Sequence, residues 1–309
     1  MGQFSITFSN VLLALLYMLP GYLLCRRKMV NPDHLSSISV ILLYVCSPCM
    51  FLNALIPLDS SADLTAKMGL FLLFTLMSQM LFMAVLFLVF RRRQQVFRYR
   101  MLNIASVLGN VGFFGLPLVT ALFPDAPVTA SYSCIFCVSM NILAWTMGVF
   151  CLTGDRKYIS PRAAFLNPTV LSVALGFVLY LLNAKSWLPS MLTGGVRTVA
   201  GMTTPLSMFI LGIRLATLDL KSLFSVPFHY GIAAGKLILF PLFSFLLVQL
   251  VPADPVFKAS VLILSAAPCA SIILNLAEMH GNGQQMAARC ALLSTLLSVI
   301  TLPLLSFLL

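Results

Sequence analysis

Charged side chains are scarce in this chain of 309 residues: 9% are Asp, Glu, Lys or Arg, whereas 60% are hydrophobic. A soluble globular domain carries about 25% charged residues. Water would not solvate so apolar a chain, and its mean hydropathy of +1.02 indicates that lipid is its main solvent. At roughly 20 residues per transmembrane helix, the length allows ten spans with short connections and no separate soluble domain.

Acidic residues are the rarest charged type, with eight Asp and Glu against nineteen Lys and Arg. Seven of the eight fall in predicted loops or at span edges, and Glu278 is the one carboxylate close to a predicted span. Intramembrane sites for sodium ions or protons built from carboxylates are therefore not expected. A coupling Na+ or H+, if one is used, would have to interact with backbone carbonyls and hydroxyls.

Residue sets for catalysis or metal binding are also missing from the predicted spans. They contain no Ser/His/Asp set and no paired carboxylates, and the pairs Cys46–Cys49 and Cys134–Cys137 have no histidine nearby at zinc-ligand spacing. No phosphate-binding glycine–lysine loop is present either. We expect neither an enzyme nor an ATP-driven pump, and no metal site or cofactor.

What the chain has in abundance is long apolar stretches. We predict ten spans, at 4–25, 35–56, 65–90, 97–123, 127–153, 168–184, 193–216, 222–251, 255–279 and 284–308. Fourteen Lys and Arg fall in the loops on one side and four in the loops on the other, with Lys236 inside the eighth span. The positive-inside rule places the richer loops in the cytoplasm and both termini outside. The net charge of +11 is thus explained by the orientation of the chain in a cell membrane, and we expect no nucleic-acid partner. The membrane would be the plasma or inner membrane.

Prolines recur at corresponding places in the two halves of the chain. Ser47–Pro48 in the second span corresponds to Thr204–Pro205 in the seventh, and Pro117 in the fourth to Pro268 in the ninth. Five spans per half would give the halves opposite orientations, and matched helix interruptions in inverted halves indicate a transporter's binding site. We predict two inverted repeats, residues 1–153 and 169–309, joined by a cytoplasmic linker at 154–168.

The fourth span carries the most unusual segment, Gly109 to Pro117, with three glycines, Asn110 and a proline. Such a segment does not favour a continuous helix. We predict two half-helices whose free N–H groups attract anions and whose free carbonyls attract cations. The alternative is that Gly112 and Gly115 are small residues for helix packing. The ninth span has a similar interruption at Ser265 to Ser271, followed by Asn275.

Lys236 is the only basic residue well inside a predicted span. An intramembrane charge is costly and suggests a function, such as attracting a carboxylate or replacing a coupling cation. Its long side chain could equally extend to the membrane interface. Lys236 and Glu278 are therefore the candidate charge or coupling residues.

Several motifs resemble the auxin efflux carrier family. They are Asn110 to Pro117, Gly235–Lys236–Leu237 with Pro241, Ser265 to Pro268, Leu276 to Glu278, Ala287 to Arg289, Ser294 to Ser298 and Thr301 to Pro303. Bacterial members of that family are described as permeases for malonate or other organic acids. The resemblance covers the whole chain and agrees with the ten predicted spans.

The resemblance implies a fold related to the bile-acid sodium symporters. Spans 1, 2, 6 and 7 would form a scaffold, and spans 3–5 and 8–10 a transport core in which broken spans 4 and 9 cross, with Pro117 and Pro268 marking the crossing. Transport would occur by an elevator-like movement of the core, and the protein would be a homodimer. The candidate substrate-binding residues are Asn110, Gly112, Gly115, Pro117, Pro268, Ser271 and Asn275.

The function expected from these observations is secondary transport of small organic anions such as malonate or other carboxylates. An anion channel, or a carrier of amino acids or other small solutes, is the alternative. The expected partners are the small organic anion, membrane lipid and a second copy of the chain.

Overall fold

The computed structural model describes residues 2–309, and within them the secondary structure is helical apart from one isolated β-bridge. Seven helices are long and apolar enough to cross a membrane: Gln3–Arg26, Leu35–Leu55, Ala62–Val89, Val128–Thr153, Ser190–Thr217, Pro227–Val248 and Gln284–Leu308. Shorter apolar helices occupy Val111–Leu122, Pro168–Leu181 and Pro255–Ser265. The prediction of an all-helical, multi-pass membrane protein is confirmed.

The first half of the chain contains ten α-helical segments. They are α1 (Gln3–Leu16), α2 (Met18–Arg26), α3 (Leu35–Ile41), α4 (Ser47–Leu55), α5 (Ala62–Val89), α6 (Phe97–Ala105), α7 (Leu116–Leu122), α8 (Val128–Leu143), α9 (Val149–Thr153) and the short α10 (Pro161–Phe165). Wide π-helical turns lead directly into three of them: η2 (Leu42–Cys46) into α4, η4 (Val111–Gly115) into α7 and η5 (Ala144–Gly148) into α9.

The second half follows a similar plan. Its segments are α11 (Pro168–Leu181), α12 (Ser190–Gly201), α13 (Thr203–Thr217), α14 (Leu220–Phe224), α15 (Pro227–Ala234), the π turn η8 (Gly235–Leu239), α16 (Phe240–Val248), α17 (Pro255–Ser265), α18 (Ser271–Met279) and α19 (Gln284–Leu305). Side-chain caps begin several helices. Asn167 accepts a hydrogen bond from the Val170 N–H, and Asp254 accepts one from the Phe257 N–H.

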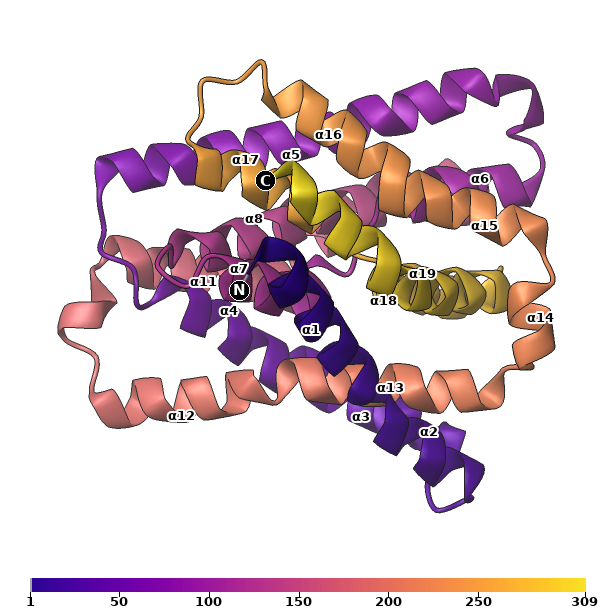
Figure 1. Cartoon of the computed structure of the whole chain (residues 1–309), viewed down its shortest axis with the longest axis horizontal. Coiled ribbons are helices and arrows are strands. Elements are labelled where there is room, and N and C mark those ends of the chain that lie inside the picture. Colours follow the sequence, from indigo (N-terminus) through magenta and orange to yellow (C-terminus); the bar gives the residue numbers. More distant parts are fainter. Residues whose placement is uncertain (1) are drawn as a thin grey trace.

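Two sets of helices account for much of the packing, and α1 packs on α19 as well. In one set α2 packs on α13, and α4 packs on α11 and α12. Gly21 of α2 and Gly212 of α13 permit the closest approach, because a Cβ on either would overlap the partner's backbone. In the other set α5 packs on α8, α16 on α17, and α19 on α15 and α18. Figure 1 shows α12 and α13 along one edge of the molecule and α15 and α16 along the opposite edge.

Three intramembrane prolines each follow a π-helical turn. Pro48 comes after η2, Pro117 after η4 and Pro241 after η8, in each case six residues beyond the first residue of the turn. A proline ring collides with the carbonyl four residues earlier in a regular α-helix, and a wider turn gives that carbonyl room. The carbonyl of Phe113, four residues before Pro117, instead accepts a hydrogen bond from Thr204 Oγ1 at 2.9 Å. The prolines are thus accommodated without ending their helices.

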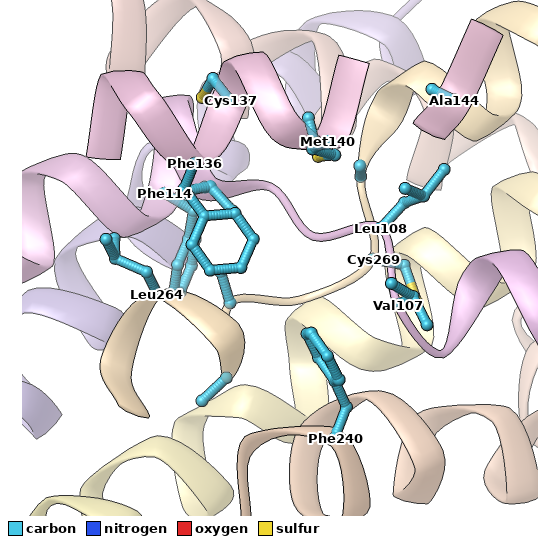
Figure 2. Packing of buried hydrophobic residues seen from close by; sticks show 14 of the residues in the cluster. Val107, Leu108, Phe114, Phe136, Cys137, Met140, Ala144, Phe240, Leu264 and Cys269 are labelled. Atoms are coloured by element: carbon cyan, nitrogen blue, oxygen red, sulfur yellow. The ribbon is translucent and has the colours of Figure 1, made fainter. Parts of the chain in front are cut away.

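The two predicted broken spans are both interrupted. The chain unwinds after α6 over Ser106–Asn110 and after α17 over Ala266–Ala270, and these two segments cross. They pair antiparallel at Gly109 and Cys269. The Asn110 N–H donates to Pro268 O at 2.6 Å and the Ala270 N–H donates to Leu108 O at 3.0 Å. Figure 2 shows Leu108 and Cys269 side by side at this crossing, with Phe240 of α16 pointing toward it.

The position of the first break differs from the prediction. The unwound segment ends at Asn110, whereas Val111–Gly115 is wound as η4 and closed by a 3.0 Å hydrogen bond from the Gly115 N–H to Asn110 O. Pro117 therefore lies in the first turn of α7 and does not mark the crossing. The π turn and the helix start tolerate proline, so no unwinding is required there. Pro268 does lie at the crossing.

Candidate functional site

A cavity of about 320 Å³ lies against one face of the crossing and is called the Asn110 cavity. Its lining includes the start of η4 and the start of α18, together with side chains of α4, α8 and α11. It brings together four predicted substrate-binding residues: Asn110, Gly112, Ser271 and Asn275. No charged side chain is among its lining residues in the described chain.

Among the polar side chains that line this cavity, those of the predicted residues Asn110, Ser271 and Asn275 make no hydrogen bond within residues 2–309. The other amides that line it are already bonded. Asn141 Nδ2 donates to Cys137 O at 2.8 Å, and Asn167 caps α11. Buried polar groups are normally hydrogen-bonded, so unpaired ones facing a cavity are available for a ligand. Asn110 is 5% exposed, so it is buried beside the cavity.

Backbone donors add to these side chains. The N–H groups of Ser271 and Ile272, which begin α18, have no acceptor within the described residues, and the same holds for Gly112 and Phe113 in η4. All four residues line the Asn110 cavity. Free N–H groups at the start of a helix carry partial positive charge and bind anions. The site can therefore hold a small anion without any basic side chain.

The remaining predicted substrate residues lie elsewhere. Gly115 is buried, and a Cβ there would lie 3.0 Å from Leu264 Cδ2, so it supports the helix-packing interpretation for this position. The Pro268 carbonyl is used in the crossing. Pro117 lines a different cavity. The sequence left two interpretations for Gly112 and Gly115, a helix break that binds substrate or close helix packing. Of the two glycines, only Gly112 lines the Asn110 cavity.

Lys236 lies at the crossing and lines neither cavity. Its side chain is fully buried, and Nζ donates to Ser265 O at 2.7 Å and to Val107 O at 3.1 Å. The ammonium also lies 4.7 Å from the centre of the Phe240 ring. The alternative in which Lys236 extends to the membrane interface does not fit this burial.

Glu278 lies near the end of α18 and pairs with Arg214 of α13 at 2.6 Å. The Glu278 side chain is 47% exposed, and it lies outside the Asn110 cavity. In this structure it connects α18 with α13 at the surface.

A second cavity, of about 570 Å³, is called the Arg197 cavity. It is lined by residues of α1, α4, α7, α12 and α13, including Asn53, Pro117 and Thr204. Arg197 of α12 is the only charged residue among its lining in the described chain, and no ion pair of this arginine occurs there. Arg197 is one of the four basic residues that the sequence analysis assigned to the loops poorer in charge. It is also the fifth residue of the predicted seventh span, and that position was the available signal.

Apolar helices broken at a crossing, with helix N-terminal ends facing a cavity, are typical of a transport protein. The chain belongs to the membrane transport protein family, the auxin efflux carriers, whose family model matches residues 6–162 and 157–306. The resemblance of the sequence motifs to this family is thereby confirmed. The family and the similar proteins below are transporters and not enzymes.

Two transporters from other organisms are similar to this chain. A "Putative malonate transporter" of Rhizobium meliloti is 26% identical over 295 residues, which cover 91% of this chain and 89% of that protein. An uncharacterised transporter of Methanocaldococcus jannaschii is 25% identical over 312 residues, which cover 95% of this chain and 96% of that protein. Both alignments span nearly the full length of each chain.

Proposed function

We propose that this transporter is a secondary carrier of small organic anions, with malonate or a similar short carboxylate as substrate. The observation that carries the proposal is the Asn110 cavity, where four free backbone N–H groups and three unpartnered polar side chains converge. A carboxylate accepts hydrogen bonds from such donors, and the helix N-termini favour its charge. The name of the similar protein of Rhizobium meliloti agrees with this substrate class.

We further propose ten spans arranged as two inverted repeats, residues 1–153 and 169–309, with the linker between them in the cytoplasm. The two breaks support this arrangement, because both half-helices end directly before a five-residue unwound segment, at Ser106–Asn110 and at Ala266–Ala270. The antiparallel pairing of the two segments suits a pair related by inversion.

Transport would proceed by an elevator-type movement. The core of spans 3–5 and 8–10 would slide against the scaffold of spans 1, 2, 6 and 7 and carry the crossing with it. The Asn110 cavity and the Arg197 cavity would then be the inward and outward approaches to one site. Bonds between core and scaffold would break during the movement, among them those of Thr204 with Phe113, of Arg214 with Glu278 and of Tyr180 with Thr65.

The basic loops support an orientation for the two cavities. Asn167 and Met279 line the Asn110 cavity next to the predicted cytoplasmic loops, so we propose that the structure faces inward. Arg197 would lie at the outward approach. Its charge would raise the local concentration of an anion there.

Uptake of labelled malonate into proteoliposomes tests the function. Uptake that saturates, is competed by other short carboxylates and shows counterflow would establish a carrier. Flux without saturation or counterflow would favour a channel. No uptake or exchange with any acid in the panel would overturn the organic-anion proposal, and amino acids or other small solutes would be tried next.

A further inference from the structure

Lys236 is the one buried charge at the crossing, and it lies on the side away from the Asn110 cavity. Its ammonium bonds to Ser265 O, the last residue of α17, and to Val107 O in the unwound segment after α6. It thus contacts the C-terminal residue of α17 and the turn that directly follows the end of α6. No ion pair to Lys236 occurs in the described residues, and all eight acids lie in loops or near helix ends.

Helix C-terminal ends present free carbonyls and partial negative charge, so two of them meeting in an apolar environment require a cation. A metal ion bound by carbonyls would meet that need, and so does the Lys236 ammonium. The surrounding chain is shaped around it. A Cβ on Gly109 would lie 2.8 Å from Nζ, and a Cβ on Gly235 would lie 2.5 Å from Ser106 Oγ. Gly109 leaves the room that the Lys236 ammonium occupies, and Gly235 lets the lysine's own helix approach Ser106 of the unwound segment.

We propose that the Lys236 ammonium is a tethered cation that replaces a coupling sodium ion at the crossing, so that the anion binds and moves without Na+. Only the crossing segment, including Gly109, separates the ammonium from the Asn110 cavity. The bound carboxylate and the lysine then carry opposite charges through the membrane together. This pairing lowers the cost of moving an anion through a medium of low dielectric constant. The inference rests on the proposed function of organic-anion transport.

The test compares wild type with Lys236→Met, which keeps much of the side-chain volume without the charge, and Lys236→Ala, which leaves a space. Lys258→Met is the control, because Lys258 on α17 bonds only to Gln249 at the surface. Malonate uptake into proteoliposomes is measured in sodium and in choline media at the same membrane potential, with and without ethylammonium. Melting temperatures of the purified proteins are measured in the same media.

Wild type is expected to take up malonate at rates that agree within twofold in sodium and in choline, and Lys258→Met should match it. Lys236→Met should lose about tenfold or more in every medium, because two carbonyl ends are left unpaired. Lys236→Ala should recover severalfold when ethylammonium or Na+ fills the space. In the melting assay ethylammonium should stabilise Lys236→Ala but neither wild type nor Lys236→Met.

Several outcomes would overturn the inference. One is wild-type uptake that Na+ accelerates tenfold, and another is a Lys236→Met protein with wild-type uptake. If wild type transports no acid at all, the proposed function fails instead. The melting assay still decides the tethered-cation inference, because a Lys236→Ala protein that no small cation stabilises would contradict it.

Discussion

The two faces of the helix crossing differ in how their backbone groups are satisfied. On the face toward the Asn110 cavity, N–H groups at the starts of η4 and α18 have no partner within the described residues. On the other face, the carbonyls of Val107 and Ser265 are bonded by Lys236. Both faces arise from the same two breaks. The comparison teaches that a broken helix becomes a binding site only where the chain itself leaves the free groups unfilled.

The largest effect is expected from a change that disturbs both faces together. Gly109→Ala would place a Cβ against the Lys236 ammonium and next to the Ala267 carbonyl. Uptake should fall by more than tenfold, since the crossing must shift to make room. The matched control is Gly69→Ala on α5, where a Cβ meets no atom within 4 Å. A Gly109→Ala protein with wild-type uptake and melting temperature would show that the close contact is unimportant.

The next effect belongs to the cavity face alone. Asn110→Ala should raise the KM for malonate by up to about tenfold, as expected for the loss of one hydrogen bond at a buried site. Asn110→Asp has nearly the same shape but adds a negative charge beside the substrate carboxylate. Its KM should rise further than that of Asn110→Ala. Equal KM values for all three proteins, at normal protein yield, would remove Asn110 from the site.

A smaller effect is expected at the outward approach. Arg197→Gln should raise the KM about threefold at low ionic strength, because the arginine attracts the anion from a distance. The difference should shrink in 0.5 M salt, where the Debye length is only a few ångströms. A KM increase that salt does not change would indicate direct contact with the substrate instead of long-range attraction.

The smallest effect is expected from Pro117→Ala. Pro117 lies in the first turn of α7, outside the Asn110 cavity. The carbonyl of Phe113, four residues before it, already accepts a hydrogen bond from Thr204. Uptake should stay within twofold of wild type. A loss of uptake of more than tenfold with an unchanged melting temperature would contradict this and support Pro117 as a substrate-binding residue, as the sequence predicted.

Much of the fold could be predicted from composition and hydropathy, because lipid requires long apolar helices and leaves few alternatives. The existence of the two breaks could also be predicted from clustered glycine and proline. The exact position of the breaks was harder to predict from the sequence. A proline signals that an ordinary helix is disturbed, and the sequence does not distinguish unwinding from a π turn, which is what accommodates Pro117.

The site was predictable to a similar degree. Asn110, Ser271 and Asn275 could be chosen as uncharged polar residues next to breaks in apolar segments. The role of Lys236 could not be settled, because a position within a span does not give the direction of a long side chain. Arg197 was missed for a related reason. A charge near a span edge is usually a loop charge, and only the packing of α12 against α4 places Arg197 beside a cavity.

The most direct test of the central claim is an experimental structure of the protein in lipid nanodiscs with malonate bound. The expected result places a substrate carboxylate in the Asn110 cavity, within hydrogen-bond distance of the Ser271 and Gly112 N–H groups, with Lys236 still bonded to Ser265 on the opposite face. Malonate bound away from both helix starts, or bonded directly to Lys236, would contradict the assignment of the two faces.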